Sequence, residues 1–253
     1  MKESLCVIPA VILAGGRGTR LGSLTQETPK PLVKVANSPI IVNQLTELGS
    51  AGVRTVVVST GYKAERLIEE LLDGSKFGID IYYSHEEKPL GRGGGIKKAL
   101  LEIVKDWKHA IVRNGDNFAS DLNYQKLLDF HRDKNALVTV VVAERSAGES
   151  LGYGLVEMDD KARIRSFREK PDSIKGASRV LINAGIYIIS SEAVHRFPDS
   201  GDHERELFPN LALEGSLYGY SIQNWMTVDT LEDLEKAEQN FRLTQFLPVP
   251  QAG

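Results

Sequence analysis

The chain has 253 residues and a formal net charge of −3, from 31 Lys plus Arg against 34 Asp plus Glu. This length suits one large α/β domain better than two independent full-sized domains. The charge balance provides no overall basic field, which argues against nucleic acid or an anionic membrane surface as a partner. Cys6 is the only cysteine, so an internal disulfide and a cysteine-cluster metal site are excluded. There is no signal-peptide cleavage pattern and no run of about 20 apolar residues, and we expect a soluble, cytoplasmic protein.

Apolar runs of strand length alternate with segments of helical periodicity over residues 1–136. The pattern predicts strands at 7–13, 55–60, 79–84 and 110–114, and helices at 40–48, 63–72, 93–105 and 122–132. Strand, helix and strand in short-loop succession imply parallel pairing through right-handed crossovers, hence a doubly wound α/β sheet. Ligands of such sheets bind at the carboxyl ends of the strands.

Residues 137–243 have a different, strand-rich texture. Strands are predicted at 138–143, 155–158, 164–167, 180–189 and 217–222, and helices at 204–213 and 231–241. We interpret this half as strands that complete the sheet and cover the same cleft, so that 1–243 form one domain. Residues 244–253 are expected to form a frayed C-terminal tail.

The most informative segment follows the first predicted strand. Residues 13–21 read LAGGRGTRL, and residues 28–32 read TPKPL. Glycines let backbone N–H groups converge on phosphate oxygens, and Arg20 and Lys30 supply positive charge. The segment is not a Walker loop, because no Gly-Lys-Ser/Thr follows, and it is not a dinucleotide fingerprint, because Leu21 stands where a third glycine is required. A glycine loop alone is equally typical of a tight strand-to-helix turn with solvated cations.

Three further motifs fall at or near the ends of predicted strands. Asn114-Gly115-Asp116 places a carboxylate at a strand's carboxyl end, a position that suits Mg²⁺, which prefers one or two carboxylates together with substrate phosphates and water. Glu169-Lys170 follows the strand at 164–167, and Asn183-Ala184-Gly185 interrupts the strand at 180–189, where a glycine suggests close approach by a ligand. Taken singly, each motif is also typical of a turn, a surface loop or a bulge.

Taken together and in this order, the motifs resemble the sugar-1-phosphate nucleotidyltransferases, the nucleotide-sugar pyrophosphorylases. The signature of that family opens with Leu-Ala-Gly-Gly-x-Gly-Thr-Arg-Leu and continues with Pro-Lys-Pro, and the resemblance covers residues 7–243. It implies a Rossmann-like fold with a nucleotide-binding half, 1–136, and a sugar-phosphate-binding half, 137–243. It also implies the reaction: a sugar 1-phosphate oxygen attacks the α-phosphate of an NTP, pyrophosphate leaves, and Mg²⁺ is the cofactor. Such enzymes supply nucleotide sugars for polysaccharide biosynthesis.

The resemblance further implies roles for individual residues. The catalytic residues would be Arg20, Lys30, Asp116 and Lys170. The NTP would contact Leu13, Ala14, Gly15, Gly16, Arg17, Gly18, Thr19, Arg20, Lys30, Glu86, Gly91 and Asp116. The sugar 1-phosphate would contact Asn114, Gly154, Glu169, Lys170 and Asn183, and the metal would be held by Asp116 and Asp229.

The first departure from the family concerns the second metal ligand. The common pattern is Trp-x-Asp-x-Gly-Thr-Pro-Glu, whereas residues 225–232 read WMTVDTLE, with Thr227 in place of the Asp. Asp229 is two residues further on, and positions two apart in a strand share a face. Glucose-1-phosphate cytidylyltransferases have a similar Trp-x-x-x-Asp-Thr-Leu arrangement, which favours Asp229 as the substitute ligand. The alternative is that Asp229 or Thr230 only caps the final helix, because residues 230–233 have capping-box spacing.

The second departure lies in the segment expected to recognise the base, residues 86–94. Guanylyltransferases for mannose and heptose phosphates have a similar Glu-x-x-Pro-Leu-Gly-Thr-x-Gly, so Glu86 would accept hydrogen bonds from the N–H edge of guanine. Arg92 replaces the usual Thr. This segment favours GTP, while the C-terminal motif is closer to enzymes that use CTP.

The leading hypothesis is therefore guanylyl transfer from GTP to a hexose or heptose 1-phosphate. A glucose-1-phosphate cytidylyltransferase is one alternative, and CTP-dependent transfer to a non-sugar phosphate such as phosphocholine or a phosphonate is another, against which Glu169, Lys170 and Asn183 argue. A catalytically silent nucleotide-sugar sensor is a third, motivated by Thr227 and opposed by the retention of Arg20 and Lys30. The base, the sugar, homo-oligomerisation and the pathway stay open.

Overall fold

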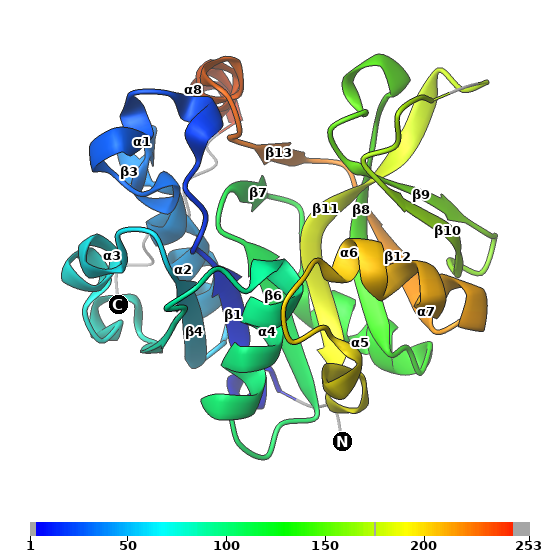
Figure 1. Ribbon diagram of the computed structural model, residues 1–253, viewed down its shortest axis with the longest axis horizontal. Coiled ribbons are helices and arrows are strands. Elements are labelled where there is room, and N and C mark those ends of the chain that lie inside the picture. Colours follow the sequence, from blue (N-terminus) through cyan, green and yellow to red (C-terminus); the bar gives the residue numbers. More distant parts are fainter. Residues whose placement is uncertain (1–3, 175, 245–253) are drawn as a thin grey trace.

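The computed structural model describes residues 4–174 and 176–244, and its centre is a nine-stranded mixed sheet (Figure 1). The strands follow the order β10-β9-β11-β6-β1-β4-β5, with β8 beside β11 and β12 beside β8. The nine strands are β1 (Ala10–Leu13), β4 (Thr55–Thr60), β5 (Asp80–His85), β6 (His109–Asn114), β8 (Val138–Ser146), β9 (Gly154–Met158), β10 (Ile164–Glu169), β11 (Arg179–Ser190) and β12 (Leu217–Ile222). Two small two-stranded sheets pair β2 (Lys34–Val35) with β3 (Ser38–Pro39), and β7 (Asn117–Ala119) with β13 (Trp225–Thr227).

The helices connect these strands and cover both faces of the sheet. The α-helices are α1 (Leu24–Glu27), α2 (Ile40–Ala51), α3 (Ala64–Leu71), α4 (Gly91–Glu102), α5 (Tyr124–Asp133), α6 (His203–Glu206), α7 (Phe208–Glu214) and α8 (Leu231–Thr244). Short 3-10 turns occur at Leu5–Val7, Thr19–Leu21, Lys30–Leu32, Ser75–Phe77, Ala147–Glu149 and Ser191–Arg196. Within the described ranges, no helix is both long and apolar enough to span a membrane.

The first half of the chain forms the parallel part of the sheet. Strand β1 lies between β4 and β6, parallel to both, and Leu13 at its end is level with Ser59 of β4 and Asn114 of β6. After β1 the chain adds β4 and then β5 on one side of β1, and it then crosses back to place β6 on the other side, which makes the carboxyl end of β1 the switch point of the topology. A crevice is therefore expected at the loops that follow Leu13, Thr60 and Asn114.

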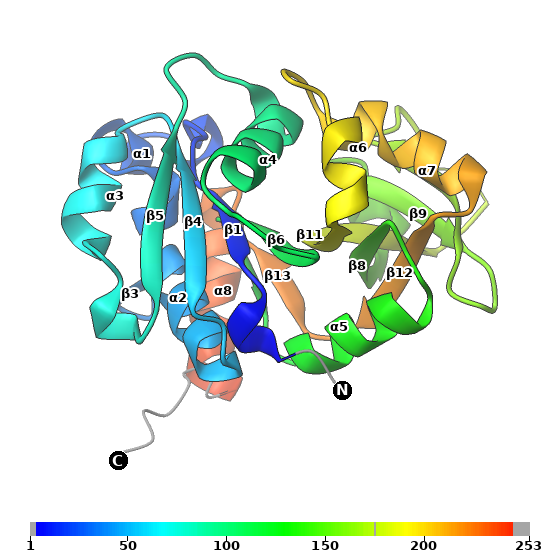
Figure 2. The same cartoon turned by 90° about the horizontal axis from the view of Figure 1, so that it is seen from below.

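Two hydrophobic clusters lie on opposite faces of the sheet. Ile12 faces α2, α3 and α5 through partners such as Leu45 and Leu67, whereas Val11 faces α4, α6 and α7 through partners such as Ile96 and Phe208. Figure 2 shows α4, α6 and α7 on one side of the sheet and α2 and α5 on the other. The expected doubly wound α/β class is confirmed.

The second half adds antiparallel strands to the same sheet. Strand β11 runs antiparallel to β6, β8 and β9, and its pairing with β8 is interrupted between Asn183 and Tyr187. Gly185 in this interruption has φ +69°, a backbone conformation that glycine adopts without steric cost. The bulge directs residues 183–185 toward the carboxyl end of β6.

A third hydrophobic cluster attaches the last helix to the beginning of the chain. Leu21 and Val35 from the N-terminal region pack with Phe118 of β7 and with Val228 and Phe241. The backbone N–H of Ala36 donates to Glu238 Oε1 at 2.9 Å. Helix α8 consequently lies against β2, although more than 180 residues separate them in the sequence.

The predicted elements differ from the observed ones at a few places. The first strand begins at Ala10 instead of residue 7, because Leu5–Val7 forms a 3-10 turn ahead of Pro9. The predicted helix at 204–213 is divided into α6 and α7, because Pro209 has no N–H to continue the helical hydrogen bonds. Strand β7 was not predicted. The expected tail at 244–253 lies outside the described residues except for Thr244, which belongs to α8.

The glycine run at 91–95 has a packing role that the sequence did not reveal. The N–H of Gly93 donates to Gly201 O at 3.0 Å, and the N–H of Gly201 donates to Leu90 O at 2.8 Å. A Cβ on Gly94 would lie 2.5 Å from the carbonyl oxygen of Asp199. The start of α4 is therefore in direct backbone contact with the segment 198–203 of the second half.

We expect Gly94→Ala to lower the free energy of unfolding by about 1–2 kcal/mol. Overpacking against the Asp199 carbonyl costs roughly 1–3 kcal/mol, which exceeds the gain of up to about 1 kcal/mol in helix propensity. Urea unfolding measures the difference. Gly148→Ala is the control, because a Cβ there meets nothing within 4 Å, and its effect should stay within about 0.5 kcal/mol. A Gly94→Ala protein more stable than the wild type would contradict the contact.

Candidate active site

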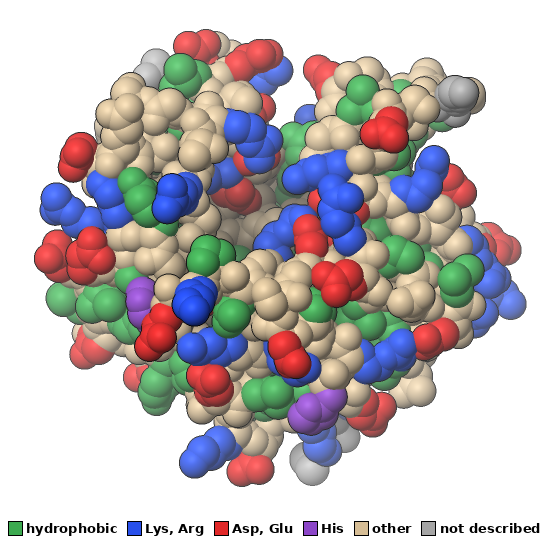
Figure 3. Space-filling view, in the orientation of Figure 1, with side chains coloured by type: hydrophobic (Ala, Val, Ile, Leu, Met, Phe, Trp, Pro, Cys, Tyr) green, Lys and Arg blue, Asp and Glu red, His purple; other side chains and the backbone are tan. Residues whose placement is uncertain are grey.

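Two connected cavities lie at the carboxyl ends of the parallel strands. Figure 3 shows the molecule hollowed at its centre, with a notch above the hollow and Lys and Arg side chains along its walls. The larger cavity, of about 470 Å³, is lined by residues of the glycine segment 15–20 together with Lys30, Ser59, Glu86 and Gly91; we call it the loop cavity. The smaller, of about 90 Å³, is lined by Gly154, Glu169, Asn183 and Glu204 among others; we call it the strand cavity.

Six residues line both cavities and therefore mark the place where the two meet. They are Arg20, Arg92, Asn114, Asp116, Lys170 and Asp229. All but Arg92 had been predicted as site residues from the sequence. Three cations and two carboxylates at one junction make it suited to anionic groups that arrive from both cavities.

The glycine segment is fixed to the end of β4 and leaves part of its backbone open. The N–H of Ala14 donates to Ser59 O at 2.8 Å, and Gly15 O accepts the N–H of Tyr62 at 3.2 Å. A Cβ on Gly16 would meet nothing within 4 Å, whereas Gly18, at φ +64°, allows the Lys30 side chain to pass close to it. The segment therefore presents free backbone to the loop cavity.

Seven residues had been predicted from the LAGGRGT portion of the segment to contact a nucleotide, and the structure separates them. Leu13, Gly15, Gly16, Gly18 and Thr19 line the loop cavity. Ala14 is buried beneath it, and the guanidinium of Arg17 lies 5.7 Å from the centre of the Tyr62 ring. Ala14 and Arg17 are not among the residues that line the cavity.

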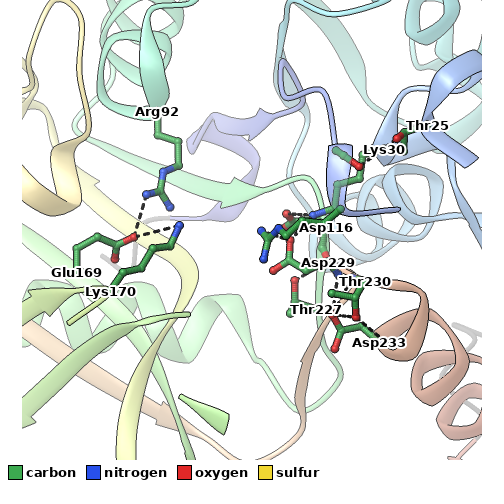
Figure 4. Close-up of polar contacts among 12 residues, drawn as sticks. Thr25, Lys30, Arg92, Asp116, Glu169, Lys170, Thr227, Asp229, Thr230 and Asp233 are labelled. Carbon is green, nitrogen blue, oxygen red and sulfur yellow. Dashed lines mark hydrogen bonds and ion pairs between the residues drawn. The ribbon is translucent and has the colours of Figure 1, made fainter. Parts of the chain in front are cut away.

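Lys30 joins two carboxylates that come from opposite halves of the chain. Its Nζ lies 2.6 Å from Asp116 Oδ2 and 2.6 Å from Asp229 Oδ1, and Arg20 Nη2 donates to Asp229 Oδ1 at 2.8 Å (Figure 4). Burial acts to lower the pKa of Lys30, but Asp116 and Asp229 outweigh it and the pKa is raised. The two carboxylates therefore keep this ammonium protonated although Lys30 is only 9% exposed, and they converge on one cationic centre.

Asp229, not Thr227, reaches this centre. Strand β13 pairs with β7, which places Thr227 opposite Asn117, and the Thr227 hydroxyl donates to the backbone oxygen of Asp116 at 3.2 Å. Strand β13 ends at Thr227, so the expectation that Asp229 shares a strand face with residue 227 was wrong. Asp229 instead lies in the turn between β13 and α8, and this turn directs its side chain to Lys30.

The same turn also caps α8. The carboxylate of Asp233 accepts the N–H of Thr230 at 2.9 Å, and the Thr230 hydroxyl accepts the N–H of Asp233 at 3.2 Å. This reciprocal pair is a capping box. Capping is therefore carried out by Thr230 and Asp233, which leaves the Asp229 carboxylate available to the site.

A second charged group faces the first across the cavities (Figure 4). Glu169 and Lys170 follow β10, and Lys170 Nζ lies 3.8 Å from Glu169 Oε1. Arg92 Nη2 donates to Glu169 Oε1 at 3.1 Å and to Asp202 Oδ2 at 2.5 Å, and it forms an ion pair with Glu204. The three carboxylates lie within 4.8 Å of one another, a spacing that could hold a metal ion, but the Arg92 guanidinium stands among them.

The environment of this group is largely buried. Burial raises the pKa of Glu204 to about 8; Arg92 opposes this shift, whereas Glu169 and Asp202 add to it. Asn183 lines the strand cavity, and its side chain is held there, because its amide donates to Glu204 and to the Tyr187 hydroxyl and its oxygen accepts the N–H of Gly185. Its predicted neighbour in the site, Asn114, has a buried side-chain oxygen without a hydrogen-bond partner among the described residues.

The sequence had not singled out Ser59, Asp202 or Glu204 as site residues. Ser59 donates to Glu86 Oε1 at 3.0 Å, and the N–H of Leu90 donates to Glu86 Oε2 at 2.9 Å, so the Glu86 carboxylate is held in place. Glu204 had been placed on a predicted helix without a reason to expect burial. The sequence offered two separate signals, the acidic pair Asp202 and Glu204 and the glycine run 91–95 that contains Arg92. They are far apart in the sequence, and only the fold brings them together.

The comparisons with known proteins agree with this geometry. The family model described as "Nucleotidyl transferase" matches residues 9–242. Mannose-1-phosphate guanylyltransferase of Mycobacterium tuberculosis is 36% identical over 231 residues, which are 89% of this chain and 62% of that protein. The mannose-1-phosphate guanyltransferase of Yarrowia lipolytica is 37% identical over 228 residues, 88% of this chain and 61% of that protein. The chain thus spans about three fifths of the length of these relatives.

Solved structures give the same result for the fold. HddC from Yersinia pseudotuberculosis superimposes with a TM-score of 0.76 at 28% identity, covering 92% of this chain and 99% of that one. The complex of HddC with GMP-PN gives the same TM-score at 29% identity and the same coverage. From the matched family model and these relatives, the chain belongs to the nucleotidyl transferase family.

Proposed function

We propose that this protein transfers a guanylyl group from GTP to a hexose or heptose 1-phosphate, giving a GDP-sugar and pyrophosphate. The observation that carries the proposal is the meeting of two cavities at one set of charges, Arg20, Asp116, Lys170 and Asp229 among them. A reaction between two phosphate-bearing substrates requires this arrangement, because both anions must approach each other closely. The names of the relatives and the GMP-PN complex of HddC support the same reaction class.

In this proposal the triphosphate lies along the glycine segment. The open backbone at Gly16 offers N–H groups, and Arg20 and Lys30 neutralise the phosphates that react. Lys170, at the junction with the strand cavity, holds the phosphate of the sugar. Glu169 accepts hydrogen bonds from sugar hydroxyls, and Asn114, at the junction of the cavities, contacts the sugar 1-phosphate.

The chain's own residues have little covalent work to do. The sugar 1-phosphate is already an anionic nucleophile near neutral pH, so no general base is required to activate it. Its oxygen forms a bond to the α-phosphorus, the bridging oxygen to the β-phosphate takes the electron pair of the bond that breaks, and pyrophosphate leaves. Positioning and neutralisation of the developing charge by Arg20, Lys30 and Lys170 would supply most of the acceleration.

Asp116 and Asp229 fit the Mg²⁺ ion that the family implies. Their oxygens each contact the same Lys30 ammonium, so they already converge on a position where a cation is stable. Two carboxylates that leave room for phosphate oxygens and water are the ligand set Mg²⁺ prefers. Bound there, Mg²⁺ would neutralise charge on the triphosphate.

Glu86 is the residue we propose for recognition of guanine. Ser59 and Leu90 occupy one lone pair on each of its oxygens, which leaves acceptor capacity directed by a rigid support. Guanine presents adjacent N–H donors on its Watson–Crick edge, and a fixed carboxylate complements them.

The decisive test is a matrix of four NTPs against a panel of sugar 1-phosphates, with pyrophosphate release as the measurement. We expect the highest kcat/KM with GTP and a hexose or heptose 1-phosphate, and loss of turnover when EDTA removes the metal. CTP with phosphocholine and with glucose 1-phosphate belongs in the matrix as the main alternative. A folded protein that binds NTP but turns over no pair would be a sensor instead of an enzyme.

The metal assignment is tested by comparing Asp229→Asn with Thr227→Val. We expect Asp229→Asn to lower kcat roughly 100- to 1000-fold and to weaken Mn²⁺ binding to the free protein, because half of the carboxylate pair is lost. Thr227→Val removes only one hydrogen bond and should cost less than about tenfold. Asp116→Asn should match Asp229→Asn. Equal effects at positions 227 and 229 would remove Asp229 from the metal site.

Base recognition is tested with Glu86→Gln and its exposed neighbour Glu87→Gln. Glu86→Gln replaces one acceptor oxygen by a donor, so kcat/KM for GTP should fall roughly 10- to 100-fold while the value for other NTPs falls much less. Glu87→Gln should leave both values unchanged, because Glu87 does not line the loop cavity. A uniform loss across all NTPs in Glu86→Gln would show that Glu86 supports the fold of the loop and not the choice of base.

A further inference from the structure

Arg92 connects the segment proposed to recognise the base with the cavity proposed for the sugar. It is the second residue of α4 and lies within the segment 86–94 that begins at Glu86. Its guanidinium contacts Glu169, Asp202 and Glu204, and Figure 4 shows it beside Glu169, facing Lys30, Asp116 and Asp229. The Arg92 side chain thus lines both cavities, but of the residues that line them it pairs only with Glu169 and Glu204 of the strand cavity.

The three carboxylates around Arg92 could not remain together without a cation. The side chains of Glu169 and Glu204 are only 3% and 1% exposed, so water screens their repulsion poorly. A buried carboxylate without a partner takes up a proton or moves away. The pKa of Glu204 is raised by burial, with Glu169 and Asp202 adding to the shift, which is the direction that this repulsion produces.

Arg92 fixes one oxygen of Glu169 and leaves the other toward the strand cavity. Oε1 accepts from Arg92 at 3.1 Å. Glu169 is directly opposite Gly154 in the pairing of β10 with β9, and a Cβ on Gly154 would lie 2.8 Å from Oε2. While Arg92 holds Oε1, Oε2 lies above Gly154, and there it can accept a hydrogen bond from a sugar hydroxyl.

The backbone continues this connection to Glu86. Leu90 donates its N–H to Glu86 Oε2 and accepts the N–H of Gly201 at 2.8 Å. Gly201 in turn accepts the N–H of Gly93 at 3.0 Å, next to Arg92. Glu86, Leu90, Arg92 and Glu169 therefore belong to one continuous hydrogen-bonded unit that crosses from the first half of the chain to the second.

We propose that Arg92 is a positioning residue for the sugar: it holds the Glu169 carboxylate in its orientation above Gly154, and it ties that carboxylate to the segment that holds the nucleotide base. This inference rests on the proposed function, because it assigns a role within the same two-substrate site. Arg92 touches neither reacting phosphate in this scheme and acts through Glu169.

The test compares Arg92→Ala with Lys97→Ala, and Arg92→Lys is the conservative variant. Lys97 is also on α4 and forms a 2.6 Å ion pair with the exposed Asp199, which belongs to the segment 198–203. Lys97 lines neither cavity. For Arg92→Ala we expect KM for the sugar 1-phosphate to rise roughly 10- to 100-fold, the effect of one hydrogen bond to a charged group. The affinity for GTP without acceptor should change less than about threefold, as should kcat at saturating sugar, and Lys97→Ala should match the wild type in every value.

Rescue separates positioning from a general loss of structure. Guanidinium at millimolar concentration should lower KM for the sugar in Arg92→Ala, whereas equal NaCl should not, and Arg92→Lys should lie between the wild type and Arg92→Ala. An unchanged sugar KM in Arg92→Ala would overturn this inference, as would equal losses in sugar and GTP binding without rescue. A wild-type protein that turns over no substrate pair overturns the proposed function and this inference with it, whereas an active wild type with an indifferent Arg92 overturns this inference alone.

Discussion

The contact of the Lys30 ammonium with the carboxylates of Asp116 and Asp229 is the interaction on which the arrangement of the site depends. Each partner is at least partly withdrawn from water, and a buried charge that loses its partner costs roughly 3–5 kcal/mol. In the sequence, Asp116 is 86 positions and Asp229 is 199 positions from Lys30. The fold must therefore hold three distant segments in one place, and much of the molecule outside the central sheet serves that purpose.

Two features of the fold bring these segments together. The pairing of β13 with β7 places the end of β13 beside Asp116, where the N–H of Val228 donates to the Asp116 backbone oxygen at 2.9 Å. The third hydrophobic cluster then packs Val228 and α8 against Leu21 and Val35, next to the loop that carries Lys30. An apolar cluster that lines neither cavity thereby determines the spacing of charges in the site.

The sequence predicted the parts of this structure that are encoded locally. The strands and helices of the parallel sheet follow from apolar periodicity, and Lys30, Asp116 and Glu169 follow from motifs at strand ends. Strands β7 and β13 have three residues each, too few for any periodicity, so the pairing that delivers Asp229 was not visible. The surroundings of Arg92 were not visible either, because Asp202 and Glu204 approach it only through the packing of Gly93 and Gly94 against residues 198–203.

Asp229 reaches the site by a different geometry from the one that the sequence suggested. Strand alternation suggested a shared face for residues 227 and 229, but β13 ends at Thr227. The segment between β13 and α8 instead directs the Asp229 carboxylate to Lys30. Because Thr230 and Asp233 satisfy the first N–H groups of α8, the aspartate between strand and helix is free of capping duty. A carboxylate two positions beyond residue 227 thus contacts Lys30, because Thr230 and Asp233 cap the helix in its place.

The charges of the strand cavity bear on the choice between a sugar and a cationic acceptor such as phosphocholine. A quaternary ammonium group binds best over open aromatic faces with no competing cation. Trp225, which lines this cavity, already has the Arg145 guanidinium 5.2 Å from its ring centre and the Tyr153 ring against it at 5.6 Å, and its indole N–H donates to Ala184 O. Arg92 adds a second cation within the cavity itself. The Trp225 face that a trimethylammonium group would need is thus already covered by Arg145, and the positive charge of Arg92 is already paired with carboxylates. The acceptor oxygens of Glu169 instead complement the neutral hydroxyl donors of a sugar, which is the physical reason to favour the sugar 1-phosphate.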